Sequence, residues 1–225
     1  MKDFCFITMV TTLLLTSCTN PEGIIKIRGK VLDEDTKALI PRREIIVQSL
    51  VKIDDTLVPV NAGQFISDSS GGFEYTLKKV KNSYLFNFCL VGDSDFAFST
   101  QTLGITELNK YGQFLNLYMS KLSDFTITIE RQSKSPTPDT LFLSWESGGI
   151  DGKILYPYEV VNFGVAPDRA FIWIGGNVKS LIKTKAFADK RTTVWWKLYR
   201  NGKRKETTDT IFCRRDAINY VNIKY

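Results

Sequence analysis

Short runs in which apolar and polar residues alternate recur along most of this chain, and they constrain its fold more than any other feature. Residues 25–31 (Ile-Lys-Ile-Arg-Gly-Lys-Val) and 73–77 (Phe-Glu-Tyr-Thr-Leu) alternate in this way. A period of two is the period of a strand with one buried face. Turn residues such as Asp, Gly, Ser and Asn separate the runs. The pattern predicts an all-β chain with two tandem β-sandwiches, over residues 24–132 and 140–225.

The first half of the chain contains enough strand-like runs for one sandwich. We expect these strands at residues 25–31, 44–51, 73–77, 84–91, 114–119 and 125–129. Gly29-Lys30-Val31, then Ile40-Pro41 before residues 45–47, then the turn at 68–73 and Tyr84 follow one another in that order. This order resembles the carboxypeptidase regulatory-like domain, a small sandwich related to transthyretin. The resemblance implies a non-catalytic scaffold or interaction module.

Residues 133–139 (Ser-Lys-Ser-Pro-Thr-Pro-Asp) form the predicted linker between the two sandwiches. Pro136 and Pro138 prevent a central strand and favour an extended, stiffened connection. After the linker, strand-like runs are found at residues 140–145, 156–161, 170–174, 192–200, 203–213 and 217–225. Residues 180–189 are predicted as a loop or a short helical turn.

The clearest local signal is a hairpin around Asn201-Gly202, the pair that favours a two-residue type I′ turn. Alternation along residues 192–200 places one set of side chains in the core (Val194, Trp196, Leu198) and another outward (Trp195, Lys197, Tyr199). This hairpin, with its Thr-rich return strand and a last strand after it, resembles an immunoglobulin or fibronectin type III sandwich. The resemblance implies an architecture, and an architecture does not specify a function.

The outward residues of this hairpin predict a surface for a ligand or partner, made of Trp195, Lys197, Tyr199 and Arg200. Aromatic rings stack on the C–H faces of sugars, and they are also the usual anchors of protein interfaces. Lys197 and Arg200 can bind carboxylates or sulfates. Three interpretations stay open: a glycan platform, a protein interface, and simple packing of Trp195 and Tyr199 under a loop or against the first sandwich.

No histidine occurs among the 225 residues. Its absence removes the commonest general base, the triads that depend on it, and most zinc sites. The sequence also contains no serine elbow, phosphate loop or dinucleotide fingerprint. The loop at 92–95 offers two carboxylates, whereas calcium needs about six to eight oxygens, so we expect a turn there. The sequence therefore predicts a non-enzymatic protein without a metal or cofactor.

A short apolar run at the N-terminus ends in Leu15-Thr16-Ser17-Cys18. The run is shorter than the roughly 20 residues that span a membrane, and it fits a removable signal segment. Its end resembles the lipobox of bacterial lipoproteins. The resemblance implies that residues 1–17 are a signal peptide, that Cys18 is acylated, and that residues 18–23 are a tether. It places the protein in the cell envelope, anchored to the outer membrane, with the periplasmic or surface face left open.

Positive charge is concentrated in the second half of the chain. Residues 18–132 carry 13 Lys and Arg against 14 Asp and Glu, whereas residues 133–225 carry 16 against 9. An exported protein with such a half is suited to an anionic glycan or an acidic envelope protein. A solvated basic face is the simpler explanation. Nucleic acid is not expected in this compartment.

Two cysteines stay available once the signal and the acylated residue are set aside. Cys89 and Cys213 both lie in apolar, strand-like runs. A buried thiol behaves as a small apolar side chain. We therefore expect two free buried thiols rather than a disulfide between the sandwiches.

Overall fold

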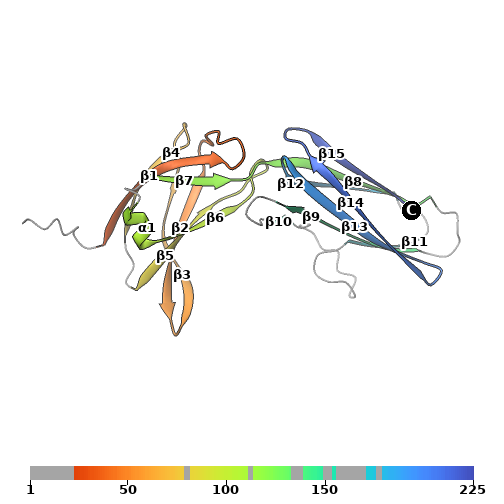
Figure 1. Cartoon of the computed structure of the whole chain (residues 1–225), viewed down its shortest axis with the longest axis horizontal. Coiled ribbons are helices and arrows are strands. Elements are labelled where there is room, and N and C mark those ends of the chain that lie inside the picture. The colour runs from red at the N-terminus through yellow and green to blue at the C-terminus, as the bar shows by residue number, and fades with distance from the viewer. Residues whose placement is uncertain are drawn as a thin grey trace, which may run out of the picture.

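The computed structural model describes residues 23–78, 82–110, 114–132, 139–148, 154–155, 171–175 and 179–225. Strands make up most of these residues, and α1 (Ile105–Lys110) is a single short helix among them. The strands form four sheets, which make two β-sandwiches that lie end to end (Figure 1). The prediction of an all-β chain with two sandwiches is confirmed. The predicted signal peptide and Cys18 lie outside the described residues.

In the first sandwich, a three-stranded sheet packs against a four-stranded sheet. The first sheet has the order β4 (Gly72–Lys78), β1 (Ile24–Asp33), β7 (Phe114–Met119). The second has the order β3 (Thr56–Ile66), β2 (Glu44–Ile53), β5 (Ser83–Leu90), β6 (Ser99–Gly104). Their inward side chains form one core, which includes Ile27, Val47, Phe86 and Leu117. The alternation in the sequence therefore corresponds to alternating burial.

Gly29 lets β1 and β7 approach closely. β1 pairs antiparallel with β4 and parallel with β7, where Gly29 faces Leu115. A Cβ atom on Gly29 would lie only 1.9 Å from the carbonyl oxygen of Leu115. Only glycine, which has no Cβ, fits this position.

The second sandwich also has two sheets. One has the order β12 (Lys179–Phe187), β8 (Leu122–Glu130), β15 (Ile218–Lys224). The other has the order β10 (Ile154–Leu155), β9 (Asp139–Gly148), β13 (Lys190–Arg200), β14 (Lys203–Cys213), and β11 (Phe171–Gly175) also pairs with β9. Phe125, Trp145, Val194 and Val221 are among the buried residues of this core. No helix in the described parts of the chain is both long and apolar enough to cross a membrane.

The structure differs from the sequence prediction at β8. The prediction assigned residues 122–132 to the first sandwich, but β8 pairs with β12 and β15 in the second. The chain therefore passes between the sandwiches near Ser120 and Lys121, ahead of the predicted linker. Asp139, the last linker residue, already belongs to β9, and residues 133–138 lie outside the described residues. Alternation identifies a strand, but it does not specify the sheet that the strand joins.

The prediction for residues 180–189 is wrong, because most of this segment is the strand β12. Leu181 points outward beside Lys183, so an apolar residue stands among lysines on the solvent face and the alternation is blurred. The hairpin prediction is confirmed. β13 and β14 pair without a register shift from Lys190 and Cys213 to the turn. Asn201 and Gly202 have φ values of 51° and 73°, as a type I′ turn requires.

Candidate functional site

The predicted surface lies on the outer face of the sheet that contains β9, β13 and β14. Val194 and Leu198 point into the core, and Trp195, Lys197 and Tyr199 alternate with them. Trp195 is half-buried and Tyr199 is 38% exposed. The Tyr199 ring meets Phe142 of β9 edge-on, with 5.6 Å between ring centroids and 69° between planes. This face therefore presents an aromatic row.

Hydroxyl-bearing residues flank this aromatic row. Trp195 stands opposite Ser144 of β9 and Thr208 of β14 in the strand register. Lys197 stands opposite Glu206, and its ammonium nitrogen lies 3.1 Å from the carboxylate. Arg204 also forms an ion pair with Glu206, and these two cations hold the pKa of Glu206 below its ordinary value. An anion that approached Lys197 would compete with Glu206.

Arg200 does not join this surface. Its guanidinium donates two hydrogen bonds to Asp139, from Nε to Oδ1 at 2.9 Å and from Nη2 to Oδ2 at 2.7 Å. Arg131 donates a third from Nε to Oδ2 at 2.7 Å. Hydrogen bonds from Arg200, which has the larger effect, and from Arg131 lower the pKa of the Asp139 carboxyl, although burial raises it. The structure thus brings Trp195, Lys197 and Tyr199 together and directs Arg200 to a buried carboxylate.

A charged cluster, which the sequence did not predict, lies at the junction of the two sandwiches. Arg215, in the turn before β15, donates to Asp33 of β1 from Nη1 at 2.7 Å and from Nη2 at 3.3 Å. Its Nε also donates to Asp189 at 2.9 Å. Lys190 forms an ion pair with Asp35. These pairs connect the acidic turn after β1 with the second sandwich.

The surroundings of Asp33 favour its ionised form. Burial alone would raise the pKa of this carboxyl, but hydrogen bonds from Arg215 and from the N–H groups of Thr36 and Asp35 lower it. Asp33 and Arg215 are 182 positions apart in the chain. No local sequence pattern relates residues so far apart, although the acidic run 33–35 and the basic pair Arg214-Arg215 are visible separately.

Backbone and apolar contacts reinforce this junction. Ala97 of the first sandwich clusters with Leu122 and Phe187 of the second. The Leu122 N–H donates to the Asp95 carbonyl at 2.7 Å, and the Ala97 N–H donates to the Ser120 carbonyl at 2.9 Å. The sandwiches are therefore joined by hydrogen bonds, ion pairs and a small apolar cluster as well as by the chain itself.

The acidic loop at 92–95 is a turn in the structure. Asp93 accepts hydrogen bonds from the N–H groups of Asp95 and Phe96, both at 2.8 Å, and forms an ion pair with Arg43. Among the described residues, no cluster of three or more His, Cys, Asp or Glu side chains is suited to a metal ion.

Both thiols are free and buried, as predicted. Cys213 donates a hydrogen bond to Thr192 Oγ1 at 3.3 Å, and burial raises the pKa of its thiol. A thiol with a raised pKa is a poor nucleophile. Cys213, the last residue of β14, is therefore a side chain of the second core.

No protein-family model matches this chain, and no curated protein matches its sequence. Three solved structures illustrate the similarity that the fold does have. The shaft pilin SpaA from Lactobacillus rhamnosus GG is 10% identical, with a TM-score of 0.31, and 90% of this chain and 97% of that chain are covered. A streptococcal ancillary pilin is 9% identical, with a TM-score of 0.38 and coverage of 89% and 62%. A candidate cell adhesion protein from Bacteroides ovatus is 10% identical, with a TM-score of 0.28 and coverage of 90% and 92%. Similarity at this level assigns neither a family nor a function.

Proposed function

We propose that this chain is a lipid-anchored protein of the cell envelope, held at the outer membrane, which acts as a non-enzymatic structural or binding accessory. The observation that carries the proposal is the sequence Leu15-Thr16-Ser17-Cys18. Cys18 precedes the start of β1 at Ile24 by six residues. An anchor at Cys18 would therefore hold the first sandwich close to the membrane.

The arrangement of the sandwiches supports a role in presentation. β1 begins at the end of the molecule that lies away from the second sandwich (Figure 1). An anchor at that end would place the second sandwich farther from the membrane, where a partner could reach it. The Arg215 and Lys190 ion pairs at the junction would hold the second sandwich in position.

The proposal predicts that Cys18→Ser abolishes membrane anchorage. Each buried methylene of an acyl chain contributes about 0.8 kcal/mol to membrane binding, so loss of the acyl chains should release the protein. Wild-type protein made in a Gram-negative host should partition into the detergent phase in a phase-separation assay, and Cys18→Ser should move to the aqueous phase. Cys89→Ser, which changes a buried core thiol, is the matched control and should still partition with detergent.

An unchanged distribution of Cys18→Ser would contradict the anchor. The non-enzymatic part of the proposal would fail if the purified protein turned over a substrate and a single carboxylate substitution abolished that turnover.

A second candidate is a glycan-binding accessory of an outer-membrane uptake system. The observation that favours it is the aromatic row of Trp195, Tyr199 and Phe142, with Ser144 and Thr208 beside it. Aromatic faces bind the C–H faces of sugar rings, and hydroxyl groups bind sugar hydroxyls. Lys197 and Arg204 both pair with Glu206, so neither cation is free for an anionic group, and this row suits an uncharged sugar better. Trp195→Ala, measured in the same binding assay as the variants below, tests this candidate: a loss of glycan binding confined to this variant would support it, and unchanged binding would contradict it.

A further inference from the structure

A groove runs along β8 on the outer face of the β12-β8-β15 sheet. The strand register places outward residues in four rows across the three strands: Lys185, Asp124 and Ile218; Lys183, Thr126 and Tyr220; Leu181, Thr128 and Asn222; Lys179, Glu130 and Lys224. In the two middle rows a short threonine of β8 lies between longer side chains of β12 and β15. Four rows extend over about 20 Å, since a strand rises roughly 3.3 Å per residue.

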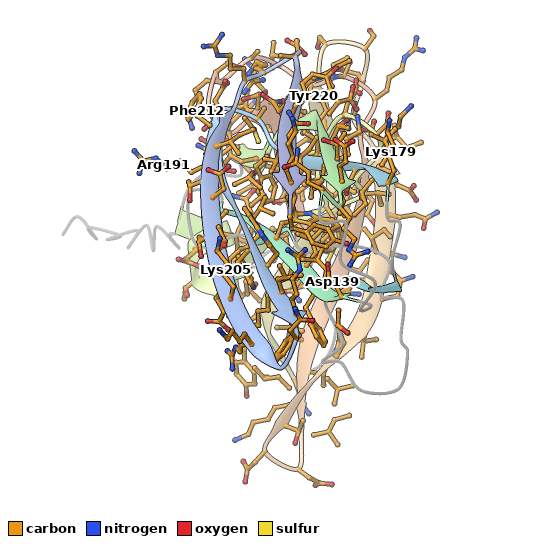
Figure 2. The ribbon with its side chains drawn as sticks, turned by 90° about the vertical axis from the view of Figure 1, so that its right-hand side faces the viewer. Asp139, Lys179, Arg191, Lys205, Phe212 and Tyr220 are labelled. Atoms are coloured by element: carbon orange, nitrogen blue, oxygen red, sulfur yellow. The ribbon has the colours of Figure 1, made fainter. Side chains whose placement is uncertain are left out.

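Two adjoining depressions follow from this difference in side-chain length. One, of about 430 Å³, is lined by Thr126, Lys183 and Tyr220 among others. The other, of about 380 Å³, is lined by Thr128, Leu181 and Asn222 among others. Leu181 lines both, so the two depressions adjoin along β8, and together they are called the groove. Figure 2 labels Tyr220 and Lys179, which come from the two strands that flank β8.

The walls of this groove leave apolar surface open to solvent. Leu181, Ile218 and Tyr220 are 55%, 55% and 57% exposed. Several large apolar side chains exposed on one face are a mark of an interaction surface. Tyrosine is suited to such a place, because its ring packs against a ligand while its hydroxyl forms a hydrogen bond.

The groove also carries an excess of positive charge. Lys185 pairs with Asp124 at 2.8 Å. Lys179, Lys183 and Lys224 have no ion-pair partner within the described residues, and Glu130 is the remaining acidic residue in the four rows. Unpaired lysines on a groove favour an anionic occupant.

We propose that this groove binds an acidic polysaccharide, one that carries carboxylate or sulfate groups along an extended chain. This inference rests on the proposed role of the chain as a binding accessory of the envelope. The lysines bind the anionic groups, Tyr220 stacks on a sugar ring, and the polar side chains on the floor and walls bind sugar hydroxyls. The Asn222 carboxamide oxygen accepts a hydrogen bond from Thr128, and its amide nitrogen has no hydrogen bond among the described residues.

The backbone of the floor favours a polysaccharide over an acidic peptide. An extended peptide usually binds a sheet by adding a strand at a free edge, where main-chain hydrogen bonds supply affinity. β8 is the central strand of its sheet and pairs with β12 and β15 along its whole length. It offers a ligand no free main-chain edge, so recognition depends on side chains that carry ring faces, hydroxyls, an amide and ammonium groups.

The groove suits an anionic ligand better than the aromatic row on β13 does. On that row Lys197 and Arg204 both pair with Glu206, so neither cation is free, and Arg200 is directed to the buried Asp139. Lys179, Lys183 and Lys224 of the groove are exposed, and they have no ion-pair partner within the described residues. We therefore assign the acidic polysaccharide to the β8 groove and keep the β13 row as a separate candidate.

Binding of the full-length chain in detergent to immobilised polygalacturonate and heparin tests the proposal, with dextran as the uncharged control. Lys183→Glu and Tyr220→Ala should each weaken binding by about tenfold or more, the size of effect expected for a central contact. Two matched controls should stay within about twofold of wild type. Lys205→Glu makes the same charge change on exposed β14, and Tyr84→Ala removes an equally exposed ring from the first sandwich. Thermal unfolding of each variant confirms that it is folded.

Four results would overturn the proposal. If the protein bound none of the acidic glycans, acidic polysaccharides would be excluded as the ligand. An equal loss in Lys205→Glu would show non-specific charge attraction. A loss confined to Trp195→Ala would move the site to the β13 row. Tighter binding of polyglutamate, lost in the same groove variants, would make the groove a peptide site. Lipid anchorage is measured separately by the partitioning of Cys18→Ser, so either proposal can fail without the other.

Discussion

Asp139 joins three strands of the second sandwich through two arginines. It begins β9, and its partners Arg131 and Arg200 lie just after β8 and at the end of β13. The side chains of Asp139 and Arg131 are 0% and 3% exposed, whereas that of Arg200 is 29% exposed. Removal of the carboxylate would leave the Arg131 charge in the interior without its Asp139 partner. The loss of one partner destabilises a fold by more free energy than the intact buried pair contributes to its stability.

We predict that Asp139→Asn lowers the free energy of unfolding by about 3 kcal/mol at neutral pH. This value is at the lower end of the range for a broken buried ion pair, because Arg200 is partly solvated. Denaturant unfolding measures this change, with Asp209→Asn on exposed β14 as a control near zero. The pKa of Asp139 is lowered in the folded state from an ordinary value of 3.8. Its ionisation therefore stabilises the fold above that value, and this contribution is lost as the pH falls through the lower folded-state pKa.

The difference in stability between wild type and Asp139→Asn should accordingly be constant from neutral pH to about pH 5 and should narrow below about pH 4. A difference that stayed constant to pH 2 would show that the carboxylate charge is not the source of the effect.

At the residue scale, alternation predicted which side chains of β13 point outward but not what their ends reach. Trp195, Lys197 and Tyr199 lie on the expected face. Arg200 falls in the alternating set of residues that point inward, and its long side chain reaches Asp139, a residue 61 positions earlier. Local periodicity carries no information on such a partner. The proximity of Lys183 and Tyr220 could not be predicted for the same reason, because these residues become neighbours only through the pairing of β12 and β15 with β8.

At the element scale, short-range signals were sufficient for the β13–β14 hairpin and insufficient for sheet membership. A two-residue turn determines both the pairing and the register of its strands. β8 has no such turn to its partners: it pairs parallel with β15, the last strand of the chain. A parallel partner must come from a distant segment, so the sheet that β8 joins could not be predicted from its own residues.

The turn itself supports a prediction at this scale. Gly202→Ala should destabilise the protein by about 1 kcal/mol, because alanine is strained at a φ of 73°. Space is not the cause, since a Cβ at Gly202 would meet no atom within 4 Å. Gly148→Ala is the matched control: it also has open space and does not have a positive φ. Thermal unfolding should separate the two variants, and equal melting temperatures would exclude backbone strain at the turn.

At the scale of the whole molecule, the junction decides whether the two sandwiches move as one body. Arg215 contacts Asp33 across the junction and Asp189 within the second sandwich, so a single side chain connects the two sandwiches. Lys190 and Asp35 make a second ionic contact nearby, and Ala97, Leu122 and Phe187 make a small apolar one. Interfaces between domains of one chain permit movement unless they are large and apolar. The orientation of the second sandwich, and thus of the groove and the aromatic row, should depend on these ion pairs.

We predict that Arg215→Ala loosens the junction without unfolding either sandwich. The carboxylates of Asp33 and Asp189 would lose the guanidinium that they share, and their mutual repulsion would favour open arrangements. Small-angle X-ray scattering of purified protein should show a broader distribution of interatomic distances and a larger radius of gyration than in wild type. Arg214→Ala, at the exposed neighbouring arginine, removes the same charge and should leave both unchanged. Added salt should loosen the wild-type junction toward the Arg215→Ala profile, because screening weakens partly exposed ion pairs. If the scattering profiles of Arg215→Ala and Arg214→Ala were both identical to that of wild type, the rigidity of the junction would instead be due to the apolar cluster and to the backbone hydrogen bonds around Ser120 and Leu122.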